Sequence, residues 1–252
     1  SFKNYVESIH TGTSIPHISQ GQIADFEILA PSYEEQKAIA SVLSSLDNKI
    51  DLLLRQNQTL EAMAETLFRQ WFIEEAEESW EKGKIGDLFT LQRGFDLPSQ
   101  NRTLGKYPII SASGLNGYHE EYKIKAPGVT TGRSGLIGKV FYVWDDFWPL
   151  NTSLFVSKFK IGTPVFTYFL LKTLDLEVLN AGSAVPSLNR NDVHSIDTKI
   201  PTQDKIKKYE DYVKPLFTKL NDNHTQIQTI TQLRDTLLPK LMSGEVRVSE
   251  KK

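Results

Sequence analysis

Apolar side chains recur at alternating spacings of four and three residues in two long segments of the chain. The first series runs from Ile39 to Trp71, and the second runs from Tyr209 to Leu241. This spacing is typical of a helix that packs along a partner helix in a coiled coil. The pattern predicts a first helix from Glu34 to Glu75, about 63 Å long at roughly 1.5 Å per residue.

The residues at the start of each series indicate how the two helices begin. Ser32 precedes the first helix and Glu35 follows three residues later, which is the spacing of a capping box. Thr202 can cap the second helix. Pro215 lies inside the second series, and it is expected to kink or restart that helix because proline lacks the N–H that an α-helix uses.

Polar positions within the two apolar series indicate how the helices pair. In an antiparallel arrangement whose facing residue numbers add to 280, Asn57 faces Asn223. The other facing pairs are apolar, except for Leu46 against Arg234. A buried asparagine pair lowers stability but disfavours other registers. The alternative is two amphipathic helices packed on a globular core, with both asparagines at wet ends.

One phrase of the sequence occurs twice. GTSIPHISQGQI begins at Gly12 and GSAVPSLNRNDV begins at Gly182, which is an offset of 170 residues. The same offset, without a gap, pairs Pro31 with Pro201 and continues through both helical series. We interpret this as an internal duplication that flanks a unique block from roughly Trp80 to Leu179.

The unique block contains short β-branched and aromatic runs bounded by turn residues, which are typical of strands. Strands are expected at Tyr107–Ser111, Gly138–Val143 and Thr152–Phe159, and Asn116-Gly117 is a tight-turn signal. A helix is expected at Thr163–Leu174, with Thr163 as its cap. The predicted class is therefore α+β: one α/β domain with a curved, mainly antiparallel sheet, and two long helices in an antiparallel coiled coil.

The composition narrows the class of protein. The absence of cysteine excludes a disulfide framework and thiolate chemistry, and it fits a cytoplasmic protein. No run approaches the roughly 20 apolar residues that span a bilayer and no signal peptide is visible, so no membrane partner is expected. The net charge is −2, but residues 1–80 carry −8, whereas residues 81–200 and residues 201–252 each carry +3. The unique block is mildly basic, which permits contact with phosphates.

The segment TTGRSGLIGK superficially resembles a phosphate-binding loop. Gly132 stands six residues before Gly138 where that loop requires five, and Val140 occupies the position of the required Ser or Thr. We therefore interpret the segment as a glycine-rich hairpin whose Arg133 and Ser134 project at the tip.

No group of residues points to catalysis. The five histidines are scattered, without the spacing that holds a metal. No nucleophile elbow, Ser-His-Asp order or cofactor loop is found, so neither a cofactor nor a metal is expected. Trp144, Phe147 and Trp148 are interpreted as core residues rather than as a stacking platform. A chain with this architecture and no catalytic group is expected to recognise a partner rather than to catalyse a reaction.

Three stretches resemble the specificity subunit of Type I restriction-modification systems: PSYEEQKAIASVLSSLD at Pro31, GSAVPSLNRNDV at Gly182 and TLLPKLMSGEVRV at Thr236. The resemblance implies target recognition domains that alternate with two conserved helices, which form an antiparallel coiled coil and set the distance between the domains. Each domain would read one half of a bipartite DNA sequence. The resemblance also implies a non-catalytic subunit that binds methyltransferase subunits, which restriction subunits with motor and nuclease activity then join.

The resemblance divides the chain into four parts. Residues 1–30 match the remnant of a preceding recognition domain, 31–79 the first conserved helix, 80–201 one recognition domain, and 202–252 the second helix with a tail. Most of one recognition domain is therefore missing, which implies a half-size form. We expect a homodimer that restores two domains, and a two-fold dimer would read an interrupted palindrome.

By position, the DNA-reading loops of the family fall at Gly94–Arg102, Ser111–Tyr118, Thr131–Lys139 and Ser183–Arg190. The expected DNA-contact residues in and near these loops are Arg93, Arg102, Ser113, Asn116, Tyr118, Lys123, Arg133, Ser134, Lys139, Asn189 and Arg190. These residue types suit base edges and phosphates. The alternative is that a tip arginine is only solvated and that serine and asparagine only bond the turn backbone.

The expected function is sequence-specific recognition of double-stranded DNA for a Type I restriction-modification complex. An alternative from a different class is a scaffold or inhibitor that captures methyltransferase subunits through the coiled coil without reading DNA. Replacing Arg133 and Asn116 separates the two, because only the first function would lose DNA binding. A third hypothesis, a methyltransferase or nuclease in its own right, lacks the N-P-P-Y-like motif of adenine methyltransferases.

Overall fold

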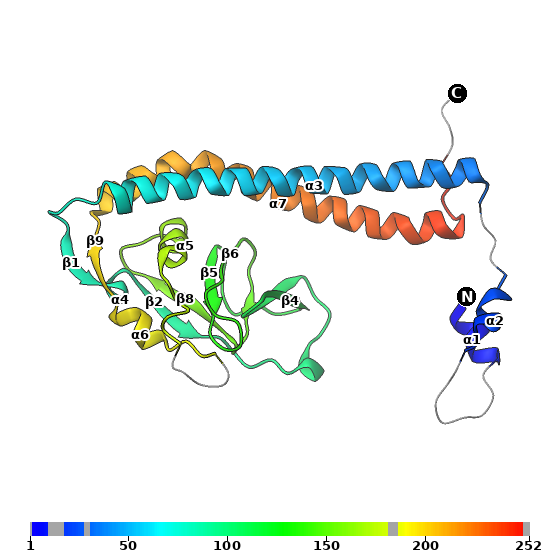
Figure 1. The fold of residues 1–252 in the computed structure, drawn as a ribbon, viewed down its shortest axis with the longest axis horizontal. Coiled ribbons are helices and arrows are strands. Elements are labelled where there is room, and N and C mark those ends of the chain that lie inside the picture. The colour runs from blue at the N-terminus through cyan, green and yellow to red at the C-terminus, as the bar shows by residue number, and fades with distance from the viewer. Residues whose placement is uncertain (1, 10–17, 28–30, 181–185, 249–252) are drawn as a thin grey trace. The chain divides into compact units, whose positions relative to one another are not determined.

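The structure is a computed structural model that describes residues 2–9, 18–27, 31–180 and 186–248 (Figure 1). The chain divides into two compact units, one of residues 1–52 with 227–252 and the other of residues 53–226. The two long helices contribute residues to both units, and the α/β domain lies within the second.

The predicted long helices are confirmed. Helix α3 spans Tyr33–Arg69 and helix α7 spans Gln203–Ser243 (Figure 1). After α3 the backbone continues as a π-helical segment, η1, at Gln70–Glu74. The helical backbone thus ends one residue before the predicted Glu75, although its last turn is wider than an α-helical turn.

Both predicted hydroxyl caps form, but among the described contacts the return bond from the Glu35 side chain that would complete the capping box is not found. Ser32 Oγ accepts a hydrogen bond from the backbone N of Glu35 at 3.3 Å. Thr202 Oγ1 accepts one from the backbone N of Lys205 at the same distance, 3.3 Å. Each hydroxyl satisfies one of the amide groups that the first turn of a helix leaves unpaired.

Pro215 does not restart the second helix, because α7 continues through it as one α-helix. A proline inside a helix costs about 3 kcal/mol, mainly through a lost hydrogen bond and a clash with the preceding turn. Pro215 is exposed, so water can bind the carbonyl that loses its partner. Val213 and Phe217 on either side of Pro215 are buried, and their packing keeps the helix continuous.

Within the second unit the helices have the predicted antiparallel register. Asn223 Nδ2 donates to Asn57 Oδ1 at 2.8 Å, and the rings of Trp71 and Tyr209 lie 6.1 Å apart, centroid to centroid. Asn223 has 0% exposure, which excludes the alternative of a wet helix end. Its Nδ2 also donates to Gln56 Oε1 at 2.9 Å, so the polar layer is wider than the predicted pair.

In the first unit, the second polar layer between the two long helices contains an ion pair. Arg234 was expected opposite Leu46, and its Nη1 lies 3.0 Å from Asp47 Oδ1. The neighbouring carboxylate therefore compensates the cation in this layer.

The start of the chain forms two short helices in the first unit. They are α1, Phe2–Ile9, and α2, Gln20–Ala24. Ser19 and Gln22 form a reciprocal capping box at the start of α2. Tyr5 Oη donates to the backbone O of Gln22 at 2.9 Å, which ties α1 to α2.

The strands of the second unit form three sheets. A two-stranded ribbon pairs β1, Glu81–Lys84, with β9, Asp197–Ile200. A four-stranded sheet has the order β2-β8-β5-β6, with strands at Phe89–Arg93, Ser153–Phe159, Gly128–Gly132 and Val140–Val143. A three-stranded sheet has the order β4-β3-β7, with strands at Gly114–His119, Tyr107–Ser111 and Trp148–Pro149. All pairs are antiparallel except β3 with β7, which confirms the mainly antiparallel prediction.

Four short helical segments complete this unit: α4, Ile85–Leu88; η2, Ser99–Asn101; α5, Pro164–Thr173; and α6, Arg190–Ser195. Helix α5 is the helix predicted after Thr163, whose Oγ1 accepts from the backbone N of Phe166 at 3.3 Å. The expected strands correspond to β3, β6 and β8, so the α+β class is confirmed.

The tight turn predicted at Asn116-Gly117 is wrong. Both residues lie inside β4, where the pairing with β3 shifts register between Pro108 and Ile110. The turn of this hairpin falls at residues 112–113. Gly117 has φ +97°, so a β-bulge uses the left-handed backbone that the Asn-Gly pair favours.

The main core of the second unit joins both long helices to the α/β domain through α5. Phe68 from α3, Phe166 and Phe169 from α5 and Tyr209 from α7 are fully buried together. Tyr209 Oη donates to the backbone O of Ala64 at 2.9 Å, so its hydroxyl is satisfied inside the core.

Two of the three aromatic residues interpreted as core are buried. Phe147 and Trp148 have almost no exposed surface. Trp144 is half-buried, and its ring packs against Phe217 of α7 at 5.8 Å. The expectation of packing rather than an open stacking platform is therefore confirmed.

Candidate functional site

Several loops of the α/β domain converge on one groove, with a volume of about 530 Å³. They are the loop after β2, the β3–β4 hairpin, the β5–β6 hairpin and the β7–β8 loop. The polar side chains that line the groove are Asp96, Ser99, Arg102, Ser111, Ser113, Asn116, Ser134, Asn151 and Thr152. Three of the four loops expected to contact DNA therefore meet in the groove.

Arg102 and Asn116 form the best-defined pair in the groove. Arg102 Nη1 donates to Asn116 Oδ1 at 2.7 Å and to the backbone O of Asn116 at 3.2 Å. Its Nε donates to the backbone O of Leu97 at 3.4 Å. The pair links the loop after β2 to the bulge of β4, and it fixes the orientation of both side chains.

Asp96 and Asn151 also line the groove, and the sequence did not single them out. Asn151 Nδ2 donates to Asp96 Oδ1, and Arg93 Nη2 lies 3.4 Å from the same oxygen. Asp96 falls in the expected loop Gly94–Arg102, so loop position was the only available signal. A carboxylate here can accept from the amino group of cytosine.

The β5–β6 hairpin forms as predicted, but Arg133 does not project at its tip. Arg133 is half-buried, and its Nη1 donates to the backbone O of Asn151 at 3.3 Å. Its backbone N donates to Thr152 O at 2.8 Å. The exposed tip is Gly135-Leu136, because the arginine supports the neighbouring β7–β8 loop. Ser134 is half-buried as well and lines the groove instead of projecting at the tip.

The fourth expected loop, Ser183–Arg190, is described from residue 186 onward, and residues 183–185 lie outside the described residues. Gly135 N donates to Pro186 O at 3.0 Å, and Leu188 N donates to Arg133 O at 2.8 Å. This segment therefore packs against the hairpin beside the groove.

Asn189 and Arg190 mark the start of α6. Asn189 Oδ1 accepts from the backbone N of Asn191 at 3.0 Å, so this side chain caps the helix. Arg190 is the first residue of α6 and is exposed. The two residues lie next to the segment that packs on the hairpin, but they do not line the groove.

The remaining expected residues also lie outside the groove lining. Lys123 Nζ stands over the Trp148 ring at 4.5 Å and lies 3.8 Å from Glu121 Oε2. Tyr118 in β4 and Lys139 before β6 are exposed. The groove thus unites Arg102, Ser113, Asn116 and Ser134, and it does not unite Arg93, Tyr118, Lys123, Arg133, Lys139, Asn189 and Arg190 with them.

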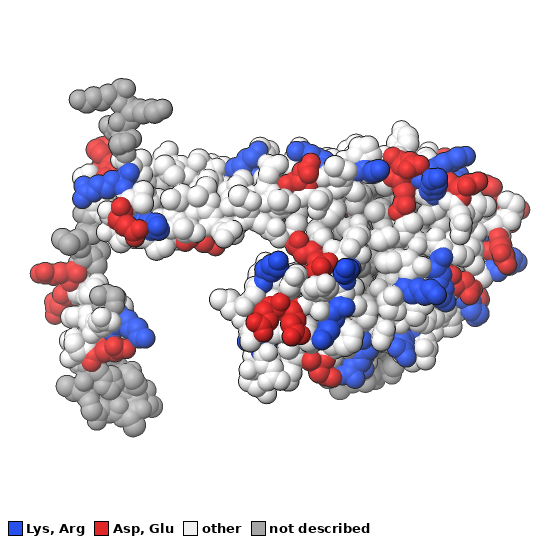
Figure 2. All heavy atoms as spheres, turned by 180° about the vertical axis from the view of Figure 1, so that it is seen from behind, with Lys and Arg blue, Asp and Glu red and all other residues white. Residues whose placement is uncertain are grey.

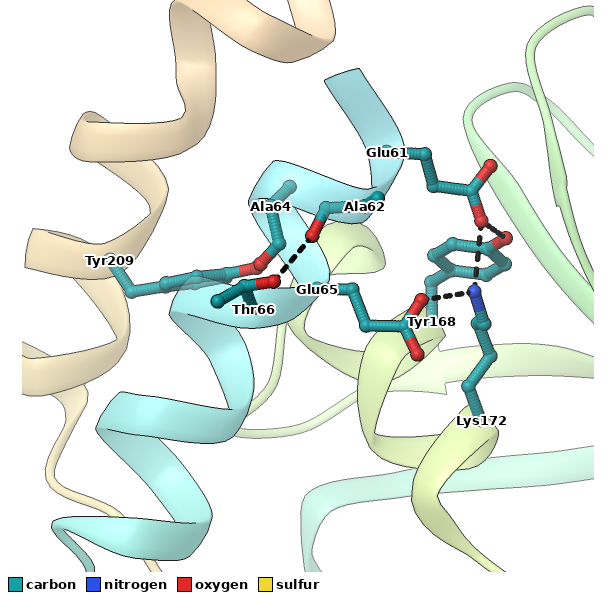
Figure 3. A network of polar contacts seen from close by, with 8 residues as sticks. All are labelled: Glu61, Ala62, Ala64, Glu65, Thr66, Tyr168, Lys172 and Tyr209. Atoms are coloured by element: carbon teal, nitrogen blue, oxygen red, sulfur yellow. Dashed lines mark hydrogen bonds and ion pairs between the residues drawn. The ribbon is translucent and has the colours of Figure 1, made fainter. Parts of the chain in front are cut away.

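A polar network holds α5 of the α/β domain on α3 (Figure 3). Lys172 Nζ lies 2.9 Å from Glu61 Oε1 and 2.6 Å from Glu65 Oε2. Tyr168 Oη donates to Glu61 Oε1 at 2.5 Å. Burial lowers the pKa of Lys172, but the hydrogen bonds and charges of the two glutamates outweigh it and raise the pKa overall. Because α5 packs on β5 and β6, the network fixes the strands behind the groove relative to α3.

Stability is expected to fall as the pH rises above about 10, and Tyr168 contributes to this fall. Burial, followed by the charge and hydrogen bond of Glu61, raises the pKa of Tyr168 well above its usual value of 10.0. The unfolded chain therefore loses the phenol proton at lower pH than the folded protein, which favours unfolding in alkali. Urea unfolding between about pH 9 and pH 11 should show a shallower decline for Tyr168→Phe than for the wild type.

The exposed Tyr33 supplies a matched control, since Tyr33→Phe removes the same hydroxyl from a residue outside the network. Identical alkaline declines for Tyr168→Phe and the wild type would contradict this assignment.

The described part of the chain lacks two further features. No group of three or more His, Asp or Glu side chains is arranged to hold a metal ion there. Among the helices described, none is long and apolar enough to cross a membrane.

Comparisons with known proteins agree on one family. The model of the Type I restriction modification DNA specificity domain matches residues 1–62 and 77–232. The Type I restriction enzyme MjaIX specificity subunit of Methanocaldococcus jannaschii is 28% identical over 99% of this chain and 67% of its own length. The HindI specificity subunit of Haemophilus influenzae is 31% identical, over 42% of this chain and 23% of its own length.

The solved S subunit of a Type I restriction-modification system from Mycoplasma genitalium has the same fold. Its TM-score is 0.60 at 23% identity, over 99% of this chain and 70% of that chain. This chain spans about two thirds of the length of the relatives that match it from end to end. It belongs to the Type I restriction-modification specificity family and is a DNA sequence-recognition subunit.

Proposed function

We propose that residues 80–201 form a target recognition domain that reads one half-site of double-stranded DNA through the groove. The observation that carries this proposal is the convergence of Arg102, Ser113, Asn116 and Ser134 from three separate loops. Arginine pairs with guanine, asparagine with adenine, and serine with either, so this set suits base edges in a major groove.

The Arg102–Asn116 hydrogen bonds prepare the groove for a base. They use both N–H groups of Arg102 Nη1 and one lone pair of Asn116 Oδ1, and Arg102 Nε donates to Leu97 O, so Asn116 Nδ2, the second lone pair of its Oδ1 and Arg102 Nη2 can bond to the DNA. Because the two side chains are already ordered, binding costs less rotamer freedom than for two free side chains.

The expected residues outside the groove would contact the backbone or support the loops. Arg93, Lys123, Lys139 and Arg190 carry charges that suit phosphates, which position a protein on a duplex without reading its sequence. Arg133 would support the β7–β8 loop, since it bonds the backbone of Asn151.

The remaining assignments concern the whole assembly. Residues 31–79 and 202–252 would be the conserved helices that set the spacing, and residues 1–30 the remnant of a preceding recognition domain. A two-fold homodimer would provide two recognition domains and read an interrupted palindrome. The subunit would act in the cytoplasm, carry no catalytic activity itself, and direct methyltransferase and restriction subunits to the target.

A selection of bound duplexes from a random pool, with methyltransferase subunits present, tests the function. We expect enrichment of a half-site that recurs in inverted orientation at a fixed spacing. An enriched site without inverted halves would contradict the two-fold arrangement, and no enrichment at all would contradict DNA reading. Asn116→Ala should weaken DNA binding and leave methyltransferase binding intact. If the variant kept both kinds of binding, the scaffold function would be favoured.

A further inference from the structure

The β1–β9 ribbon carries two lysines that face each other. Its antiparallel register places Lys82 directly opposite Lys199, and both side chains are exposed. Like charges at directly opposed positions destabilise a strand pair. Among the residues that the structure describes, neither lysine has an ion pair or a side-chain hydrogen bond. The ribbon therefore keeps two uncompensated cations at a cost to its own stability.

The next pair of the ribbon is compensated. Lys84 lies opposite Asp197, with Nζ 3.4 Å from Oδ1, and it also donates to the backbone O of Ser195 at 3.2 Å. Asp87 Oδ2 accepts from the backbone N of Lys84 at 2.8 Å. The two carboxylates nearest this end of the ribbon thus already have partners, and Lys84 links the ribbon to the end of α6.

Two cations, Lys160 and Arg190, lie near His194 of α6, which also carries Asp192. Lys160 Nζ donates to the backbone O of Gly86, which lies against His194. Burial, followed by the charges of Lys160 and Arg190, lowers the pKa of His194. The ring of His194 accepts a hydrogen bond from Leu91 N through Nε2 at 2.8 Å, which requires that nitrogen unprotonated. A cation is therefore disfavoured at this point, as expected beside other cations.

A series of packed segments connects the ribbon to the groove. The segment at 186–188 packs on the β5–β6 hairpin, α6 follows it directly, and Lys84 connects α6 to the ribbon. Figure 1 shows β1, β9, α4 and α6 together at one end of this domain. Figure 2 shows basic side chains gathered at that end, with acidic ones among them. A hollow of about 660 Å³ on the ribbon is lined by three lysines, Lys82, Lys84 and Lys199, and by one carboxylate, Asp197, which is already paired with Lys84.

We propose that Lys82 and Lys199 bind two backbone phosphates of the DNA that flanks the half-site. The inference rests on the proposed function, and it extends the DNA contact beyond the groove. Phosphates are the partner of choice because each would neutralise one lysine of a pair that otherwise repels itself. The contact would add affinity without adding sequence preference.

The test compares Lys82→Gln/Lys199→Gln with Lys208→Gln/Lys214→Gln, which removes the same charge from exposed positions on α7. DNA affinity is measured at several salt concentrations, on the selected duplex and on a scrambled one. Loss of two phosphate contacts should reduce the slope of log affinity against log salt by about 1.8. Between about 50 and 200 mM salt the wild type should therefore lose about 12-fold more affinity than the ribbon variant.

The ribbon variant should keep the sequence preference of the wild type and unfold at the same or a higher temperature, because a like-charge pair has been removed. A wild-type salt slope in the ribbon variant would overturn the inference. Loss of methyltransferase binding with an unchanged slope would also overturn it and assign the ribbon to a protein partner. Failure of the proposed function is distinguishable, because the wild-type chain itself would then select no duplex.

Discussion

Replacing Tyr209 with alanine should lower the free energy of unfolding by about 3–5 kcal/mol. Tyr209 has 0% exposure, and its ring centroid lies 5.3 Å from that of Phe72 and 5.9 Å from that of Phe68. Truncation would leave a cavity that these rings cannot fill, because α3 and α5 hold them in place. Urea unfolding followed by tryptophan fluorescence measures the loss, since Trp71 adjoins the site.

Two variants separate the causes of this loss. Tyr209→Phe removes only the hydrogen bond to Ala64 O and should cost about 0.5–1.5 kcal/mol. Tyr212 of α7 is exposed and also lies close to Trp71. Tyr212→Ala should therefore change the free energy of unfolding by no more than about 0.5 kcal/mol. If Tyr209→Ala cost no more than Tyr212→Ala, the core would not depend on this side chain.

Replacing Arg102 with methionine should weaken binding to the selected duplex by about 5- to 150-fold, which corresponds to roughly 1–3 kcal/mol for a base-reading side chain. The substitution keeps a long apolar stem but removes every donor. It also releases Asn116, whose Oδ1 accepts from Arg102 at 2.7 Å, so the second side chain loses its fixed orientation. Fluorescence anisotropy with a labelled duplex measures the affinity, and the binding of methyltransferase subunits should not change.

The matched control is Arg69→Met, which removes an exposed arginine at the end of α3. The losses for Arg102→Met and Asn116→Ala should not add in the double variant, because contacting residues couple by about 0.5–3 kcal/mol. Equal affinities for Arg102→Met and Arg69→Met would show that the groove does not read this base.

The helices were predictable in detail because a heptad pattern states which positions face a partner. Only one register matched Asn57 with Asn223, and the hydrogen bond between them confirms it. The behaviour of Pro215 was not predictable, because continuity through a proline depends on whether the freed carbonyl meets water. The Asn116-Gly117 pair shows a related limit: the sequence revealed a left-handed backbone position, but a turn and a bulge both use one.

The groove was predictable only in outline. The resemblance located the loops along the chain, but not the distances between them. The bond from Asn151 to Asp96 joins positions 55 residues apart, and no local pattern marks it. Arg133 was misplaced for the same reason, because its partner lies on the separate β7–β8 loop. DNA contacts by individual residues stay predictions.

The chain enters and leaves the α/β domain through neighbouring strands. Glu81 is paired with Ile200, so the two crossing points lie about 4.5–5.5 Å apart, as in any antiparallel pair. A different domain that begins and ends on two paired strands could replace this one without altering the length of either long helix. Such a cassette would need to preserve the face that meets Phe68 and Tyr209 and the contacts of Lys172 and Tyr168 with α3. Under the proposed function, an exchange of residues 81–200 would change the target half-site while both long helices stay unchanged.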